Sequence, residues 1–130
     1  MPVVAVSMSE SDFEELENLQ KDGGFSNRSE VVRHALQSLL DEHRELEAHI
    51  GSITAIITVV YSKKGKNTEC HHVQHKYNDI LTAMIHSHTS NGGCIEVLIA
   101  TGDSDKVKGF IKELRSQKSV TRMQINPVGG

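Results

Sequence analysis

The sequence has few of the residues that build large aromatic cores or covalent scaffolds. Its 130 residues include no tryptophan, five phenylalanines and tyrosines together, and two cysteines. The core must therefore come mainly from valine, isoleucine and leucine, and so thin a core makes association of several chains a reasonable expectation. The two cysteines, Cys70 and Cys94, are too few for a disulfide scaffold.

Long apolar runs are also missing. No stretch approaches the roughly 20 residues that a membrane-spanning helix needs, and the N-terminus lacks the basic, apolar and small-residue succession of a signal peptide. We therefore expect a soluble, cytoplasmic protein with no membrane partner. A cytoplasmic setting would keep the thiols reduced, which leaves a thiolate role open to Cys94.

Charge is distributed unevenly along the chain. Residues 1–48 hold eleven acidic residues against four basic ones, a net charge of −7, whereas residues 49–130 hold six against ten, a net charge of +4. This asymmetry predicts two modules, which we place at residues 1–48 and 52–130.

The first module reads as one strand followed by two helices. Residues 3–8 alternate as a short strand, and Ser9 is placed to cap a helix that Gly23-Gly24 stops. A second helix covers residues 26–43, with Asn27 three residues before Glu30 in a cap-like arrangement. Fewer than fifty residues with one unpaired strand cannot fold alone, so we expect the strand to pair with its copy in a second chain.

The second module alternates between strand and helix patterns. Residues 52–61 are β-branched and predict a strand, and a polar, plausibly helical stretch runs from residue 67 to 77. Further patterns predict strands at 80–88 and 94–101, a helix opened by Gly102-Asp103, and a last strand at 120–128. The order β-α-β-β-α-β is that of a ferredoxin-like module, so the fold class is α+β.

The chemistry concentrates in one predicted hairpin, 85-IHSHTSNGGC-94. Alternate side chains of a strand leave on the same face, so His86 and His88 point the same way. The turn formers at residues 89–93 can fold the chain back and bring Cys94 beside the two imidazoles. Two nitrogens and a sulfur gathered across one turn favour a metal site.

The chain resembles a known family, the NikR nickel-responsive transcriptional regulators, across nearly its whole length. The resemblance is carried by 24-GFSNRSE-30, 74-QHKYNDI-80 and 85-IHSHTSNGGCIEVLIATGD-103. It implies a ribbon-helix-helix DNA-binding module followed by an ACT-type regulatory module. It further implies a homotetrameric repressor, built as a dimer of ribbon-helix-helix dimers, that binds a double-stranded DNA operator.

The resemblance also implies a ligand set. His86, His88 and Cys94 of one subunit and His75 of its neighbour would hold one Ni(2+) per subunit in a square plane. The donor types suit nickel or copper in a plane, but tetrahedral zinc accepts them as well. His72 is the substitute if His75 is not the fourth ligand. Glu96 lies on the strand face of Cys94 and can orient a ligating histidine.

The residues expected to face DNA are less typical of the family. In a paired ribbon Val3, Ala5 and Ser7 would face the major groove, where family members commonly place arginine and threonine, and here only Ser7 can hydrogen-bond a base. The start of the second helix, with Arg28, Ser29 and Arg33, is instead a natural phosphate clamp. The net charge of −7 on this module opposes DNA binding.

Two accessory features of the family also differ. His34 occupies one position of a carboxylate pair that family members use for an interdomain cation, with Glu30 at the other. Where many members have an acidic residue and a histidine, this chain has Ser62-Lys63. With Lys64 and Lys66 these residues are expected to form a solvated loop, although the resemblance implies that basic residues of this region can reach DNA phosphates when metal is bound.

Two other functions remain open. A metal-binding protein that kept the fold but lost operator recognition would explain Val3 and Ala5. A regulator whose second module senses an amino acid or another small molecule would fit the ACT-type fold. An enzyme is the least expected class, because the site offers no general base or nucleophile beyond its proposed ligands.

Overall fold

The computed structural model describes residues 1–62 and 68–129, with the backbone alone for residues 68–71. Contacts within the chain divide it into two compact units, Met1–Asp41 and Glu42–Gly130. The sequence-based boundary lay after residue 48, whereas the contacts place residues 42–48 in the second unit. The physical reason is Leu46, which is buried in the hydrophobic core of that unit.

The first unit contains helix α1 (Glu10–Asp22) and most of helix α2 (Arg28–Glu47). Helix α2 extends beyond the predicted end at residue 43, and its last residues belong to the second unit. Both predicted caps are present. The backbone N–H of Asp12 donates to Ser9 Oγ over 3.0 Å, and that of Glu30 donates to Asn27 Oδ1 over 2.9 Å. The chain leaves α1 through Gly24, whose φ of 74° favours glycine.

The predicted strand at residues 3–8 is not formed within the single chain. Residues 1–9 have no regular secondary structure, and Val3, Val4 and Val6 are 94%, 81% and 68% exposed. A strand needs a neighbour to accept and donate its backbone hydrogen bonds, and one chain supplies only one copy of this segment. The pairing of two such segments in a dimer therefore stays a prediction.

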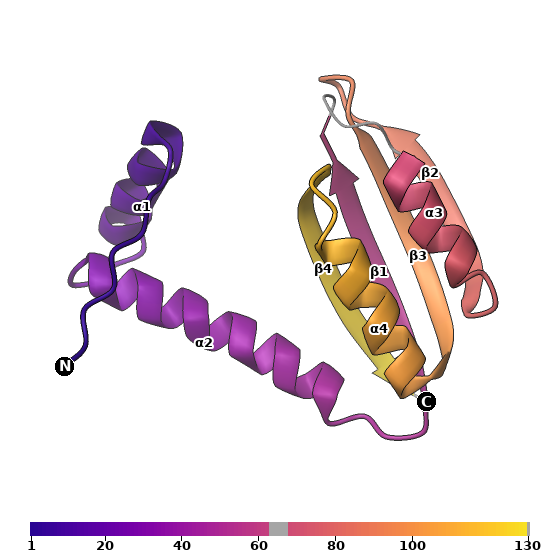
Figure 1. Cartoon of the computed structure of the whole chain (residues 1–130). Helices are drawn as coiled ribbons and strands as arrows, with labels where there is room; N and C mark the ends of the chain where they lie inside the picture. Colours follow the sequence, from indigo (N-terminus) through magenta and orange to yellow (C-terminus); the bar gives the residue numbers. More distant parts are fainter. Residues whose placement is uncertain (63–67, 130) are drawn as a thin grey trace. The chain divides into compact units, whose positions relative to one another are not determined.

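The second unit confirms the predicted β-α-β-β-α-β order. After β1 (Ser52–Tyr61) come α3 (Thr68–Lys76), β2 (Leu81–His88), β3 (Cys94–Asp103), α4 (Ser104–Arg115) and β4 (Val120–Gly129). The sheet order is β2-β3-β1-β4, and each neighbouring pair is antiparallel. Helices α3 and α4 lie side by side over one face of this sheet (Figure 1).

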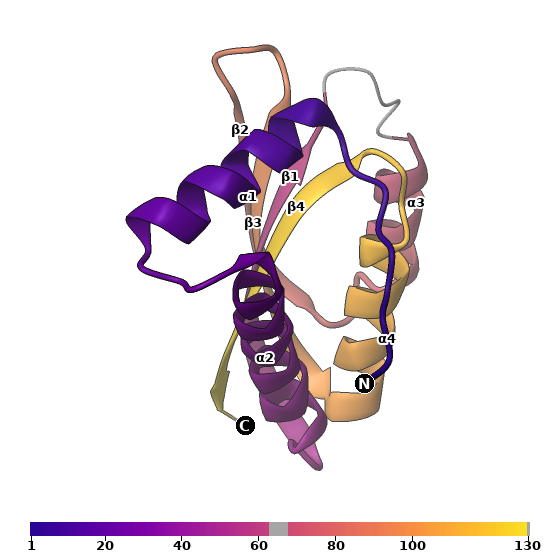
Figure 2. The same ribbon diagram turned by 90° about the vertical axis from the view of Figure 1, so that its left-hand side faces the viewer.

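The core of the second unit lies between that sheet face and the two helices. Every second side chain of β1, from Ile53 to Tyr61, is buried there, together with Leu98 of β3 and Phe110 of α4. Figure 2 shows the same layer arrangement, with α3 and α4 on one side of the strands. The Tyr77 ring, which follows α3, packs on Phe110 with ring centroids 5.3 Å apart.

The opposite face of the sheet carries apolar side chains that the two helices do not cover. The alternation of the strands places Ile56, Val97, Ile99 and Ile85 there, and Ile85 is 68% exposed. In the first unit, α2 likewise exposes Val32, Leu36 and Leu39. Exposed apolar surfaces of this kind mark interaction sites.

Candidate metal centre

The turn between β2 and β3 closes as the sequence predicts. Thr89 N–H donates to the Gly93 carbonyl over 2.8 Å, and Gly92 adopts a φ of 88°. A Cβ at Gly93 would lie 2.7 Å from the backbone oxygen of Tyr61, so only glycine lets the hairpin approach β1 this closely. The turn sets the register that pairs His88 with Cys94.

The hairpin brings three potential metal donors together. One ligand atom from each of His86, His88 and Cys94 lies within 4.8 Å of the other two. Both imidazoles are exposed, and Cys94 is half-buried. Among the described histidine, cysteine and carboxylate side chains, these three lie close enough together to hold an ion.

The separation of these donors fits a bound transition metal. Nitrogen and sulfur ligands lie about 2.0–2.3 Å from an ion of this size, so two donors on opposite sides of it are up to ~4.5 Å apart. The three donor atoms lie within 4.8 Å of one another, so small side-chain rotations would bring all three within bonding distance of one ion. The donor set of two imidazoles and one thiol suits nickel, copper and zinc, so the residues present fit a metal of this group.

The side chain of Glu96 is buried and lies next to His86. Its side chain is only 3% exposed, and its Oε2 lies 3.3 Å from Nδ1 of His86. A carboxylate on one ring nitrogen fixes the tautomer and orientation of an imidazole, which leaves the other nitrogen, Nε2, for a metal. The observed contact is compatible with the predicted orienting role of Glu96, which stays a prediction.

His75 is not a member of the three-donor group. It lies near the end of α3 with an exposed side chain, and the described donors within 4.8 Å of one another do not include it. His72, the alternative fourth ligand, is exposed on the same helix. The side chains of Cys70 and His71 lie outside the described residues. An exposed histidine on α3 is available to a second chain.

A buried glutamine beside His75 was missed by the sequence analysis. Gln74 is 6% exposed, and its Nε2 donates to Glu96 Oε1 over 2.7 Å and to the Tyr61 hydroxyl over 3.2 Å. Glutamine is usually a surface residue, and a polar helix gives no pattern that singles out one buried position. Only the packing of α3 on the sheet reveals it.

The C-terminal end of α3 is attached to α4 through Glu113. Its carboxylate accepts hydrogen bonds from Lys76 Nζ over 2.8 Å and from the Tyr77 hydroxyl over 2.9 Å. Lys76 first, and then Tyr77, lower the pKa of Glu113 below the usual value for a glutamate. These bonds hold the helix that carries His75 against the rest of the unit.

The lowered pKa of Glu113 predicts a pH-dependent attachment of α3. A carboxylate whose pKa is lower in the folded state stabilises the fold above its ordinary pKa, and this contribution is lost as pH falls through the lowered value. We therefore expect the unfolding midpoint of the metal-free protein to fall on acidification, and to fall less steeply in the Glu113→Gln variant. Thermal unfolding followed by circular dichroism between pH 7 and 3 measures both. Equal slopes would contradict the assignment.

The residues predicted to face DNA are all exposed in the single chain. Val3, Ala5 and Ser7 lie in the N-terminal segment, and Arg28, Ser29 and Arg33 lie in the first two turns of α2. The Arg28 guanidinium stacks over Phe13, 5.4 Å from the ring centroid. Arg33 forms an ion pair with Glu30, which His34 also approaches to 3.8 Å. Lys63, Lys64 and Lys66 lie outside the described residues.

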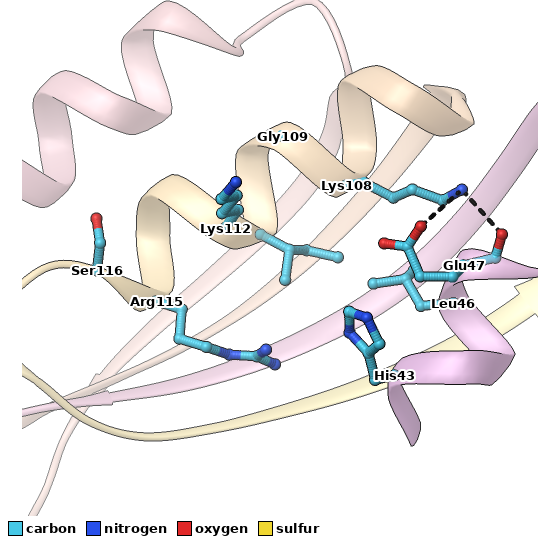
Figure 3. A pocket seen from close by; sticks show the side chains of 9 residues that line it. His43, Leu46, Glu47, Lys108, Gly109, Lys112, Arg115 and Ser116 are labelled. Carbon is cyan, nitrogen blue, oxygen red and sulfur yellow. Dashed lines mark hydrogen bonds and ion pairs between the residues drawn. The ribbon is translucent and has the colours of Figure 1, made fainter. Parts of the chain in front are cut away.

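A separate cavity lies within the second unit, between the end of α2 and α4. It has a volume of about 500 Å³ and is lined by His43, Leu46, Lys112 and Arg115 among others. Figure 3 shows Lys108 beside it, bonded to the Glu47 carbonyl over 3.2 Å. The cavity shares no residue with the three-donor group.

Comparison with known proteins supports both modules. The family model described as "NikR C terminal nickel binding domain" matches residues 54–128, and that of "Ribbon-helix-helix protein, copG family" matches residues 3–43. The first match covers more than half of the chain and contains the hairpin with its three donors. No helix among the described residues is long and apolar enough to cross a membrane.

Individual relatives match over nearly their full length and share one name, "Putative nickel-responsive regulator". A protein of Halobacterium salinarum is 30% identical over 120 residues, which cover 91% of this chain and 84% of the relative. One of Methanococcus vannielii is 26% identical over 127 residues, covering 96% and 90%. One of Methanococcoides burtonii is 24% identical over 125 residues, covering 95% and 89%.

A solved structure supports the fold of part of the chain. Uncharacterized protein TM1266 from Thermotoga maritima matches 59% of this chain and 98% of its own length, with a TM-score of 0.55 and 16% identity. The two family models, the relatives and the donor hairpin all lead to one assignment. The chain belongs to the NikR family of nickel-responsive, ribbon-helix-helix transcriptional regulators.

Proposed function

We propose that this protein is a cytoplasmic repressor that binds its DNA operator in response to nickel. Residues 1–48 form the DNA-binding module and residues 52–130 the metal-binding module. His86, His88 and Cys94 of one subunit and His75 of a neighbouring subunit hold one Ni(2+) per subunit. The observation that carries the proposal is the three-donor group within 4.8 Å, placed in a NikR nickel-binding domain.

Ligands from two chains couple metal binding to the arrangement of the subunits. The exposed position of His75, outside the three-donor group, supports a ligand lent to another chain. With all four donors engaged, two subunits keep one relative arrangement. A ligand that binds one arrangement better than another shifts the population toward it, and here this arrangement is the one that places the DNA-binding modules on two half-sites.

The exposed apolar surfaces support a homotetramer, a dimer of ribbon-helix-helix dimers. Pairing of the N-terminal segments would complete the missing ribbon, and it would cover the apolar side chains of α2, Val32, Leu36 and Leu39. The uncovered sheet face with Ile85 supports a second contact between the metal-binding modules. Both surfaces would be buried in such an assembly.

Contacts with DNA phosphates would supply most of the affinity. Arg28, Ser29 and Arg33 are exposed near the start of α2, where free backbone N–H groups also attract phosphate. Base reading would rest on Ser7, because Val3 and Ala5 offer only apolar contacts to thymine methyl groups. Sequence discrimination should accordingly be modest for a ribbon reader.

Footprinting of the promoter of the protein's own operon, with and without nickel, tests the proposal. We expect protection of two half-sites with nickel and none after chelation. The Arg28→Ala variant should bind nickel normally but lose affinity for all duplexes, and its dependence of log affinity on log salt should become shallower by about one. Equal protection of the DNA with and without nickel would contradict the proposed response.

The apolar groove face favours one alternative function. A metal-binding protein without operator recognition would explain Val3 and Ala5, and it predicts normal nickel binding with no footprint at any nickel concentration. A regulator that senses a small molecule is the other alternative. Calorimetric titration with nickel and with amino acids separates it, because nickel should then give no heat of binding while an amino acid should.

A further inference from the structure

We propose that the cavity between the end of α2 and α4 is a second ligand site, which binds a small molecule with one carboxylate and an apolar body. The cavity lies within the second unit, because every residue that lines it falls in the range 42–130. It shares no residue with the three-donor group, so the site is additional to the metal centre. The inference goes beyond the proposed function and does not rest on it.

The size and the floor of the cavity suit an apolar body. Its volume of about 500 Å³ falls in the range of roughly 300–1,000 Å³ that small-molecule sites occupy. Leu46 of α2 and Ile111 of α4 line it, and both side chains belong to the hydrophobic core. A hydrocarbon group in the cavity would lie on this aliphatic floor and leave contact with water, which favours binding.

Lys108 fixes one wall of the cavity. Its Nζ donates to the backbone oxygens of Glu47 over 3.2 Å and of His49 over 3.1 Å (Figure 3), and its side chain is only 17% exposed. These bonds attach the last turn of α2 to α4, and Leu46 anchors the same turn in the core. The cavity is therefore formed without a ligand, so that binding has a small ordering cost.

The charged groups around the cavity favour an anion. The lining contains three permanent cations, Lys108, Lys112 and Arg115, and one acidic residue, Glu47. The Glu47 carboxylate lies 3.8 Å from Lys108 and balances it, whereas the Lys112 ammonium has no ion pair with any residue that the structure describes. Arg115 lies 3.6 Å from Glu42 in a half-exposed pair. Because such pairs are weak, a ligand carboxylate can replace Glu42.

Arg115 and His43 are placed to bind the carboxylate. Figure 3 shows the Arg115 guanidinium on α4 and the His43 ring on α2 extending toward the space between the two helices. A guanidinium binds a carboxylate through two parallel N–H donors, and an imidazole N–H adds a further one. Both side chains are exposed, so the carboxylate would lie at the mouth of the cavity and the apolar body on its floor.

The carbonyl ends of the two helices do not cancel this attraction. A helix C-terminus carries about half a negative charge, and α2 and α4 both end beside the cavity. Lys108 binds the last carbonyl of α2, and the backbone N–H of Ser116 donates to the Lys112 carbonyl over 3.2 Å. The unit charges of Lys112 and Arg115 therefore exceed what remains of the helix charges.

Calorimetric titration of the full-length protein with octanoate tests the site. We expect one octanoate to bind per chain. Octanol has the same apolar body without the carboxylate, and acetate has the carboxylate without the body, so each should bind at least about 10-fold more weakly. Because octanoate would bind only the folded chain, it should also raise the thermal unfolding midpoint.

Charge variants of the cavity test the assigned residues. Arg115→Gln should weaken octanoate binding about 10-fold, because it removes the charge-assisted hydrogen bonds. Lys112→Gln should weaken it about 3-fold, and Glu42→Gln should strengthen it about 3-fold because Arg115 is then free for the ligand. Arg122→Gln is the matched control, since it removes an exposed arginine of β4 that does not line the cavity. It should leave the octanoate affinity unchanged.

Three results would overturn the inference. The first is equal affinity for octanoate and octanol, which would exclude a carboxylate site. The second is an octanoate affinity that neither Arg115→Gln nor Lys112→Gln changes, which would indicate unspecific adsorption. The third is an octanoate affinity that falls as the protein concentration rises, because a second copy of the chain would then cover the cavity.

Nickel titration separates this site from the metal centre. Arg115→Gln should keep the thiolate-to-nickel absorption of the wild-type protein, which shows that the variant is folded. If the wild-type protein binds octanoate but shows no thiolate-to-nickel band, the proposed function fails and the carboxylate site stands. If it shows the band but binds no octanoate, the carboxylate site fails and the proposed function stands.

Discussion

Replacement of Cys94 with alanine is expected to abolish stoichiometric nickel binding. The sulfur is the one soft donor of the three-donor group, and its loss leaves imidazoles as the only remaining ligands of the proposed site. Removal of a residue that only orients a ligand costs 10–100-fold in metal affinity, so loss of a ligand itself should cost at least ~100-fold. Equilibrium dialysis with nickel measures this directly.

Visible absorption spectroscopy tests the same variant in a second way. The wild-type protein with nickel should show a thiolate-to-nickel charge-transfer band together with the d–d bands of a planar ion. The Cys94→Ala variant should lose the charge-transfer band. His86→Ala should also lose stoichiometric binding. Cys70→Ala is the matched control, because it removes the other thiol of the chain. Undiminished binding in both Cys94→Ala and His86→Ala would remove the proposed site.

The second large effect is expected from the core rather than from the ligands. Phe110 is fully buried on α4 and packs against Tyr77, the residue that follows α3. Phe110→Ala should lower the free energy of unfolding of the metal-free protein by about 3–5 kcal/mol, because it removes apolar contacts and leaves a cavity. Chemical denaturation followed by circular dichroism measures the change.

A surface variant controls for this result. Val128→Ala changes an exposed residue of β4 and should alter the free energy of unfolding by about 0.5 kcal/mol or less. Because Phe110 supports the ring beside α3, a folded Phe110→Ala protein should also bind nickel less tightly. A loss of stability below ~1 kcal/mol would mean that the helix layer does not pack on the sheet as described.

Local structure could be predicted because its causes are local in the sequence. Ser9 and Asn27 cap the two helices of the first unit, since a short polar side chain can reach a backbone N–H two or three residues ahead. The strands and helices of the second unit follow from their hydrophobic periods. The tight turn at residues 89–93 follows from its turn formers and two glycines.

The three-donor group was predictable for the same reason. His86 and His88 share a strand face by alternation, and a short turn returns Cys94 to the paired position. These three residues lie within ten positions of one another, so their proximity needs only a hairpin. Glu96 was predicted from its place on the same strand face as Cys94, and the structure puts its carboxylate next to His86.

Features that depend on contacts between distant segments could not be predicted from local sequence patterns. The boundary between the units falls within α2, because Leu46 packs into a core made by later residues. The N-terminal segment forms no strand by itself, because its pairing partner is another chain. Gln74 gave no signal, because its burial arises only when α3 lies on the sheet.

The sequence by itself determined the order of the elements, the hairpin with its two imidazoles and thiol, and the resemblance to a nickel-responsive regulator. These depend on spacing along a short stretch of chain. The tertiary structure alone decided that Gln74 joins Glu96 and Tyr61 in one buried network, and that His75 stands outside its own subunit's donor group. Such placements depend on how a helix packs on a sheet, which no local pattern of residues encodes.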